Sequence, residues 1–250
     1  MNSITVITAT KNSERFLSMC LDSVVNQDCP TNHVLIDGAS TDSTLEICKK
    51  YDHHLTQIVS EPDQGIYDAL NKGVQLATGE VICILHADDF YPANDVISTV
   101  MREFDDPAVE ACFGDLKYVD RDNTGRTIRY WRSGDFSLHK MLWGWMPPHP
   151  AFFVRRSVYE KYGLFNTEMG TSADYEIMLR FLLKHRINVT YIPKVLVHMR
   201  SGGISNRSLV NRIRANRMDR LAWEVNKLKP YPWTMWMKPM RKITQWFVQG

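Results

Sequence analysis

Short apolar runs alternate with helix-like patterns over the first ninety residues of the chain. The β-branched run at residues 4–9 predicts a strand, and apolar residues at helical spacing follow it between residues 16 and 24. Further strands are predicted at residues 33–36, 55–59 and 80–85, each preceded by a helical pattern. Strands that alternate with helices pair in parallel through right-handed crossovers, with helices on both faces. The pattern therefore predicts an α/β, Rossmann-like, mostly parallel central sheet.

The pattern becomes mixed after residue 90. We expect, in order, a helix at 96–104, a strand at 109–119, a turn at 122–125, a strand at 129–131, an amphipathic helix at 174–185 and a strand near 189–192. We divide the chain at residue 206, with a first half at 1–90, a second half at 91–206 and a helical extension at 207–250.

Polar side chains follow each of the first four predicted strands at the point where the strand ends. The carboxyl ends of parallel strands share one edge of a sheet, and ligands bind beyond that edge. The residues are Thr8 and Lys11 after the first strand, Asp37 after the second, Glu61 and Asp63 after the third, and His86, Asp88 and Asp89 after the fourth. The sequence thus predicts one polar site.

The adjacent carboxylates of Asp88 and Asp89 need a cation, a hydrogen-bond donor or bulk water at the end of a buried strand. Carboxylate oxygens suit Mn²⁺ or Mg²⁺, which commonly links a carboxylate to a diphosphate. The alternative is a solvated turn that caps the next helix. Because Asp37 and Asp63 are predicted at the same edge, we favour a metal site.

Three segments, ITVITATKN, VLIDGASTDST and SEPDQGIYDALNKGVQLATGEVICILHADD, resemble in order and spacing the N-terminal half of glycosyltransferase family 2 enzymes of the GT-A fold. A weaker resemblance continues through HPAFFVRRSVYEKYGLFN and SADYEIMLR. The resemblance implies transfer of a sugar from a nucleoside diphosphate donor, expected to be UDP-linked, to an acceptor hydroxyl with inversion. It is closest to bacterial polysaccharide-assembly enzymes, which implies a lipid-linked saccharide acceptor and a role in O-antigen, capsule or exopolysaccharide synthesis.

The resemblance also implies roles for the residues at the strand ends. Thr8 and Ala9 would line the nucleoside pocket, Asp63 and Asp88 would contact the nucleotide, and Asp88 with Asp89 would hold the metal. Asp37 would accept the imino hydrogen of a pyrimidine base, although the same residue type also stabilises turns and local spacing does not choose between the two roles.

Two positions depart from the family pattern. His86 stands where the family commonly has an acid, which leaves it open as a metal ligand, a donor-sugar contact or a polar strand end. Ala69-Leu70-Asn71 replaces a frequent Ala-Arg-Asn triplet. Lys11, Lys72, Arg200 or a basic residue of the C-terminal extension would have to replace the missing arginine beside the diphosphate.

Asp174 is the expected catalytic base. The resemblance implies that an aspartate at the start of this helix takes the proton of the acceptor hydroxyl, although the family's Glu-Asp pair is Ala173-Asp174 here. An aspartate at this position also caps a helix. Glu176 is the competing acid.

Three further residues are expected to contact substrate or diphosphate. His149, among prolines, is either a substrate contact or a loop hydrogen-bonder. His198 and Arg200 lie where the family has a mobile loop that closes over the diphosphate, and Gly202-Gly203 would give that loop its freedom.

Residues 207–250 carry a net charge of +8 against −6 for the remainder, and they hold four of the seven tryptophans. Basic and aromatic residues together favour docking to an anionic membrane surface, with Trp223 packed on the main domain. Nucleic-acid binding uses a similar composition but is not expected. No signal peptide or membrane span is predicted, and the five cysteines lack paired spacing. We expect a cytoplasmic protein, peripheral on the inner face of the cell membrane.

Two other functions make different predictions about the sequence. A sugar nucleotidyltransferase needs a glycine-rich loop after the first strand to hold a triphosphate, and TATKNS contains no glycine. A non-catalytic membrane-binding or nucleic-acid-binding module predicts that Asp174→Asn leaves function unchanged.

Overall fold

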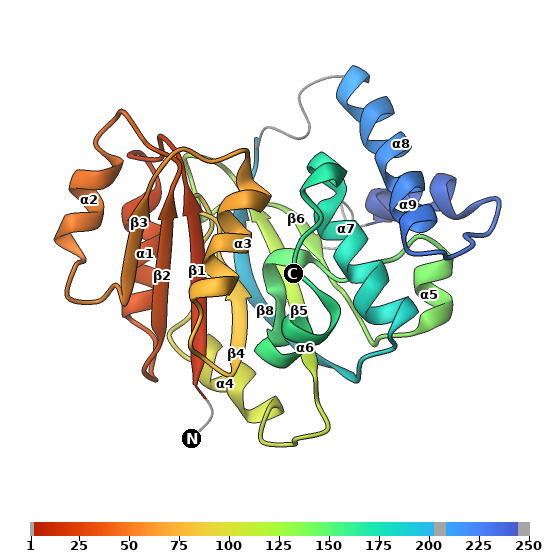
Figure 1. Ribbon diagram of the computed structural model, residues 1–250, viewed down its shortest axis with the longest axis horizontal. Coiled ribbons are helices and arrows are strands. Elements are labelled where there is room, and N and C mark those ends of the chain that lie inside the picture. The colour runs from red at the N-terminus through yellow and green to blue at the C-terminus, as the bar shows by residue number, and fades with distance from the viewer. Residues whose placement is uncertain (1–2, 203–208, 245–250) are drawn as a thin grey trace.

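The computed structural model describes residues 3–202 and 209–244, and it confirms an α/β fold with a mixed, mostly parallel central sheet flanked by helices (Figure 1). The sheet has eight strands: β3-β2-β1-β4-β7-β5-β6 form one path and β8 pairs with β5. Their bounds are β1 Ile4–Thr10, β2 Asn32–Asp37, β3 Gln57–Ser60, β4 Val81–Ile84, β5 Ala111–Val119, β6 Thr127–Trp131, β7 Phe152–Arg155 and β8 Val189–Arg200.

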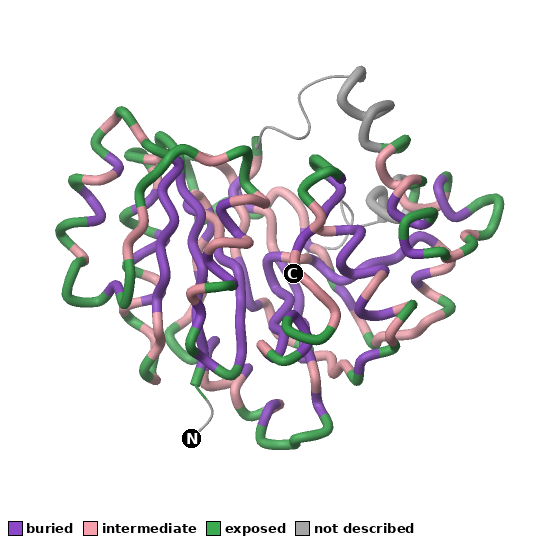
Figure 2. The backbone as a smooth tube through the Cα atoms, viewed as in Figure 1, coloured by how far each residue is buried: buried purple, intermediate pink, exposed green. Residues whose placement is uncertain are grey.

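The first four strands pair in parallel, as their alternation with helices predicts. The helices that follow them are α1 Leu17–Val25, α2 Thr44–Lys50, α3 Ile66–Leu76 and α4 Val96–Glu103. Successive residues of β1 contribute to opposite faces of the sheet. Ile7 packs in the core cluster that includes α3, whereas Val6 packs in the cluster with α1 and α4. Helices therefore cover both faces, and Figure 2 shows that β1, β2 and β4 are buried nearly throughout.

The second half enters the sheet through an antiparallel strand. β7 lies between β4 and β5 and is antiparallel to both, so it joins the two halves into one sheet. The other elements of this half are α5 Leu138–Leu142, the 3₁₀ turns His149–Ala151 and Thr167–Ser172, α6 Arg156–Tyr162 and α7 Ala173–Met178.

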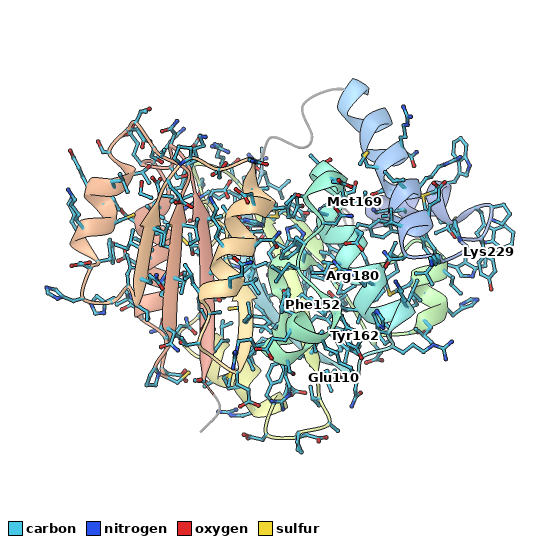
Figure 3. The ribbon with its side chains drawn as sticks, in the orientation of Figure 1. Glu110, Phe152, Tyr162, Met169, Arg180 and Lys229 are labelled. Carbon is cyan, nitrogen blue, oxygen red and sulfur yellow. The ribbon has the colours of Figure 1, made fainter. Side chains whose placement is uncertain are left out.

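The helix expected at 174–185 changes its hydrogen-bond pattern midway. It begins as α7 and continues as a π-helix at Leu179–Lys184, where the His185 amide donates to the Arg180 carbonyl. The Arg180 guanidinium donates to the carbonyls of Tyr162 and Leu164 and pairs with Glu176 (Figure 3). A π-turn widens the helix locally, and here it coincides with the residue that ties the helix to the loop after α6.

The C-terminal extension packs on the second half through α8, Leu209–Val225, and α9, Thr234–Thr244. Trp223 is 1% exposed and shares the core cluster of α3 and α7, as expected for this residue. Its indole Nε1 donates to the Tyr175 hydroxyl at 3.0 Å. Residues 203–208 and 245–250, with Gly203 and Trp246 among them, lie outside the described residues. None of the helices within the described ranges is long and apolar enough to cross a membrane.

Candidate active site

Backbone hydrogen bonds connect the ends of β1, β2 and β3 at the carboxyl edge of the sheet. The Gly38 amide donates to the Thr10 carbonyl, and the Glu61 amide donates to the Asp37 carbonyl. The Leu85 amide donates to the Ile7 carbonyl, which adds the end of β4 to the same edge. The structure thus brings together the polar strand ends that the sequence predicts.

The Asp37 carboxylate is fully buried and accepts hydrogen bonds from its own turn and from β3. Its Oδ1 accepts from the Ser40 hydroxyl, and its Oδ2 accepts from the Ser40 amide at 3.0 Å and the Ser60 hydroxyl at 2.7 Å. These contacts fix the loop in which Ala39 has a φ of +57°. They supply the turn-stabilising role directly, and a contact between Asp37 and a base remains a prediction.

Thr8 and Ala9 lie in the interior of β1. The Thr8 hydroxyl lies 2.9 Å from Nε2 of the buried His33, and Ala9 is buried in the cluster with α3. Any contact that these residues make with a nucleoside would therefore use their backbone atoms.

Asp63 and Lys11 meet above Gly38. A Cβ at Gly38 would lie 2.1 Å from Asp63 Oδ2 and 3.2 Å from Lys11 Cδ, so a larger residue would displace the side chains of Asp63 and Lys11. Lys72, in contrast, pairs with Glu61 at 2.8 Å and with Asp68 at 3.3 Å. Lys11 is therefore better placed than Lys72 to meet an anion at the strand ends.

The Asp88-Asp89 pair combines an accessible carboxylate with a buried one. Asp88 is partly exposed, whereas Asp89 is 1% exposed. Asp89 Oδ1 accepts from the Arg200 amide at 3.3 Å, and its Oδ2 is buried without a hydrogen-bond partner. Burial, reinforced by the charge of Asp88, raises the pKa of Asp89 well above its usual range. A divalent cation would relieve this repulsion, so the residues fit a metal bound from the Asp88 side.

No group of three or more His, Cys, Asp or Glu side chains within residues 3–202 and 209–244 is arranged to hold a metal ion. Mg²⁺ commonly takes only one or two ligands from protein carboxylates and the others from substrate phosphates and water.

Arg200 lies in β8 rather than in a loop. β8 continues to Arg200 and pairs His198 with Lys117 and Arg200 with Val119, so the loop expected from His198 onward begins later. The strand continues because its backbone is paired with β5. The Arg200 guanidinium carbon lies 4.9 Å from the centre of the Phe16 ring, and Nε is buried without a hydrogen-bond partner.

His198 packs against an aromatic ring. Its imidazole meets the Phe90 ring edge-on at 5.3 Å, and the two residues exchange backbone hydrogen bonds of 2.9 and 3.1 Å. Burial, with a smaller effect from Lys117, lowers the pKa of His198. These contacts anchor the segment after β4 to β8, and a diphosphate contact remains a prediction.

Arg121 is a candidate that the sequence pattern did not identify. Its guanidinium carbon lies 4.5 Å from the centre of the same Phe16 ring, which Arg15 also approaches, so three cations surround one phenyl group near Asp88 and Asp89. Arg121 follows β5 in an ordinary hairpin turn, and only the fold brings it to the sheet edge.

His86, His149 and Asp174 form a hydrogen-bonded chain at the centre of the site. Nε2 of His86 lies 3.3 Å from Nε2 of His149, and Nδ1 of His149 lies 3.1 Å from Oδ2 of Asp174. The side chains of His149 and Asp174 are 30% and 18% exposed, so solvent reaches both. All three line a small cavity of about 20 Å³, together with Tyr67 and Phe165.

The charge state of Asp174 follows from its surroundings. Burial favours the protonated form, but His149, Lys238 and the Tyr175 amide together outweigh burial, so the pKa of Asp174 lies below its usual value. Burial, with a further contribution from the charge of His149, lowers the pKa of His86 to about 3. Near neutral pH the chain therefore contains an ionised carboxylate and a neutral His86.

Glu176 points elsewhere, although it is only two residues from Asp174. Its side chain is 4% exposed and pairs with Arg180 at 2.8 Å. Asn226 Nδ2 donates to Glu176 Oε1 at 3.0 Å, which ties α7 to α8. Of the two acids in this helix, Asp174 faces the site and Glu176 holds the helices together.

Tyr67 and Tyr118 also belong to the site and were not predicted. Burial, and next the charge of Asp174, raises the pKa of Tyr67 well above its usual value. Burial raises the pKa of Tyr118, and the charges of both Asp89 and Asp174 add to this rise. Tyr118 is thus close enough to both Asp89 and Asp174 to be influenced by their charges. The GIYDAL segment contains Tyr67, but its helical pattern alone predicts a core aromatic.

Comparison with known proteins identifies the family to which the chain belongs. The model of "Glycosyl transferase family 2" matches residues 5–163. The chain is 32% identical over 206 residues to the PGL/p-HBAD biosynthesis glycosyltransferase of Mycobacterium bovis, covering 80% of this chain and 78% of that protein. It is 26% identical over 218 residues to a dolichyl N-acetyl-alpha-D-glucosaminyl phosphate 3-beta-D-2,3-diacetamido-2,3-dideoxy-beta-D-glucuronosyltransferase of Methanococcus voltae, covering 78% and 66% respectively.

Solved structures share the fold. Residues 1–349 of S. aureus TarS in complex with UDP-GlcNAc superpose with a TM-score of 0.72 at 18% identity, covering 94% of this chain and 69% of that chain. The mannosyltransferase PcManGT of Pyrobaculum calidifontis, in complex with GDP-Man and Mn²⁺, gives a TM-score of 0.66 at 21% identity, covering 95% and 72%.

Proposed function

Because the chain belongs to glycosyl transferase family 2 and is a glycosyltransferase, we propose that it moves a sugar from a UDP-linked donor to a saccharide hydroxyl with inversion. Asp174 acts as the base in this proposal. It takes the proton of the acceptor hydroxyl while that oxygen attacks the anomeric carbon from the face opposite the diphosphate.

The observation that carries the proposal is the position and charge of Asp174. Its carboxylate is partly exposed, has a pKa below the usual value and opens α7 beside the strand ends. The charges of both Asp174 and Asp89 act on Tyr118, which supports a base and a diphosphate site that belong to one cleft. A single in-line displacement needs this arrangement, because base and leaving group act on opposite sides of one carbon.

Asp88, with Asp89 behind it, would hold Mn²⁺ or Mg²⁺. When bound, such an ion neutralises charge that develops on the departing diphosphate. Basic side chains of the protein would also neutralise charge on the diphosphate. Arg200 and Arg121 lie on the Phe16 ring, and Lys11 lies over Gly38. These side chains would take over the role of the arginine that Leu70 replaces in the family triplet.

A UDP donor is supported by the UDP-GlcNAc complex of TarS. The GDP-Man complex of PcManGT represents the alternative, a donor with a guanine nucleotide. Asp37 and Asp63 would contact the nucleoside of the donor.

A lipid-linked acceptor is supported by the name of the Methanococcus relative, which acts on a dolichyl-linked sugar. We place the reaction in surface-polysaccharide synthesis.

The extension would bring the enzyme to a membrane that carries such an acceptor. Tyr231 and Trp233 stack at 5.1 Å, Trp233 packs on Trp143 at 5.7 Å, and Trp236 is 71% exposed. Figure 3 shows Lys229 at the outer edge of the molecule, on the loop between α8 and α9. Exposed aromatic rings beside lysines suit the interface of an anionic bilayer, and this surface supports a peripheral location.

The test is transfer or donor hydrolysis with a panel of UDP-, GDP- and dTDP-sugars, each with Mn²⁺ and with a chelator. Metal-dependent turnover of a UDP-sugar, with inverted configuration in the product, is the expected result. Turnover of GDP-sugars alone would replace the donor assignment. Absence of turnover with every donor, together with absence of metal-dependent nucleotide binding, would remove the catalytic proposal.

A further inference from the structure

The chain from His86 to Asp174 links three separate elements. His86 follows β4, His149 opens the 3₁₀ turn before β7, and Asp174 lies in the first turn of α7. The two imidazole rings are 5.5 Å apart and meet at 66°. The first element belongs to the predicted nucleotide half and the other two belong to the predicted acceptor half. Of the three side chains, His149 is the one that forms a hydrogen bond with each of the other two.

The hydrogen-bond partners determine which nitrogen carries each proton. An ionised Asp174 only accepts hydrogen bonds, so Nδ1 of His149 must donate to it. When His149 is neutral, Nδ1 carries its one N–H and Nε2 is an acceptor. The facing Nε2 of His86 must then be the donor. This assignment leaves Nδ1 of His86 as an acceptor, and that atom is buried without a hydrogen-bond partner.

The assignment explains why a histidine follows β4. A carboxylate at residue 86 would only accept, so it would draw the single proton of a neutral His149 to Nε2. Nδ1 would then face Asp174 as a second acceptor, and the contact with the base would be lost. A histidine at residue 86 donates instead, and it keeps the His149 proton on the side of Asp174.

We propose that His149 is the positioning residue of the base, and that His86 fixes the tautomer of His149 that performs this task. The proposal rests on the proposed role of Asp174 as the base. Asp174 Oδ1 accepts from the Tyr175 amide at 2.7 Å, and Oδ2 accepts from His149, so both oxygens are held. The carboxylate then presents its remaining lone pairs in one orientation. A displacement of about 1 Å at such a group costs on the order of 100-fold in rate.

Three substitutions of His149 separate the two ring nitrogens. His149→Asn retains an N–H near the position of Nδ1 and loses the contact with His86. His149→Gln places its amide near Nε2 and loses the contact with Asp174, and His149→Ala removes both. The measurements are kcat, the donor KM and the melting temperature of the full chain, using the donor that turns over in the panel above.

We expect His149→Ala and His149→Gln to lower kcat about 10- to 100-fold, with donor KM changed less than about threefold. His149→Asn should recover most of kcat, because the contact with Asp174 returns. Nitrogen-15 NMR of the imidazoles should show the Nδ1–H form for the signal that His149→Asn removes, and His86→Asp should change that signal.

Equal losses of kcat in the Asn and Gln variants would overturn the proposal, as would an Nε2–H form of His149. Wild-type kcat in His149→Ala, with an inactive Asp174→Asn, would overturn the positioning role and leave the base in place. Full activity of Asp174→Asn would instead contradict both the role of Asp174 as the base and the positioning role of His149. If His149→Ala does not fold, the comparison of the Asn and Gln variants decides alone.

Discussion

Nδ1 of His149 lies 3.1 Å from Oδ2 of Asp174, and this contact selects one of the two acids of α7 as the candidate base. The contact counteracts the effect of burial on Asp174 and keeps the carboxylate ionised. Glu176 has a different partner, Arg180, and is almost completely buried. The two carboxylates should therefore respond differently to loss of charge.

Asp174→Asn should lower kcat about 100- to 10,000-fold, because the amide does not accept the acceptor's proton. Glu176→Gln is the matched control. It should lower the melting temperature, since it weakens a buried ion pair, while kcat measured well below that temperature stays within about threefold of wild type. Donor turnover and thermal unfolding of both variants check this. A reversed result would assign the base to Glu176.

Asp88→Asn should abolish the stimulation of nucleotide binding by Mn²⁺, because it removes the accessible carboxylate of the pair. Calorimetric titration of nucleotide with and without Mn²⁺ measures the effect. Asp105→Asn is the control, since Asp105 is an exposed carboxylate in the loop before β5. Figure 3 shows Glu110 of the same loop at the end of the sheet opposite the site. Unchanged stimulation in Asp88→Asn would exclude Asp88 as a metal ligand.

Trp223→Ala should destabilise the protein by about 3–5 kcal/mol, because it empties a fully buried site and leaves the Tyr175 hydroxyl without its donor. Trp236→Ala provides the comparison, as an exposed tryptophan of the same extension should change stability by less than about 0.5 kcal/mol. Urea unfolding of both variants tests the prediction. Equal stabilities would mean that α8 contributes little to the fold.

Acid should destabilise the protein through His33. Burial lowers the pKa of His33 from 6.5 to about 4, so between these values the unfolded chain binds a proton that the folded chain does not. Stability should therefore fall as pH falls from about 6.5 to 4, with His33 contributing about 3 kcal/mol. His33→Gln, which retains a side-chain partner for Thr8, should flatten this dependence in urea unfolding at successive pH values. An equally steep dependence in the variant would contradict the prediction.

Replacement of Trp233 and Trp236 by alanine should weaken binding to vesicles that contain anionic lipid, with little effect on turnover of a water-soluble acceptor. Vesicle co-sedimentation checks this. Vesicles of neutral lipid and raised salt serve as controls, since both remove the attraction to Lys227 and Lys229. Point substitutions suit this test better than truncation at residue 226, because Asn226 holds Glu176. Unchanged binding to anionic vesicles would count against membrane docking by this surface.

The sequence determined the parallel half of the fold and the chemistry at its edge. Apolar runs and helical spacing are local consequences of burial on a sheet or a helix, so β1 to β4 and the helices between them were predictable. The polar residues at the strand ends were also predictable, because parallel strands have a common carboxyl edge. The family likewise followed from segments whose order and spacing are written in the chain.

Only the tertiary structure decided which partner each polar side chain has. His86 and His149 are 63 residues apart, and no periodicity relates them or joins them to Asp174. Glu176 and Asp174 look equivalent in the sequence, yet helix packing turns one toward Asn226 and the other toward His149. A local pattern reports whether a residue is buried, whereas its hydrogen-bond partner depends on how distant elements pack. That packing places His86, which departs from the family's acidic residue, beside His149, where it can act as a hydrogen-bond donor.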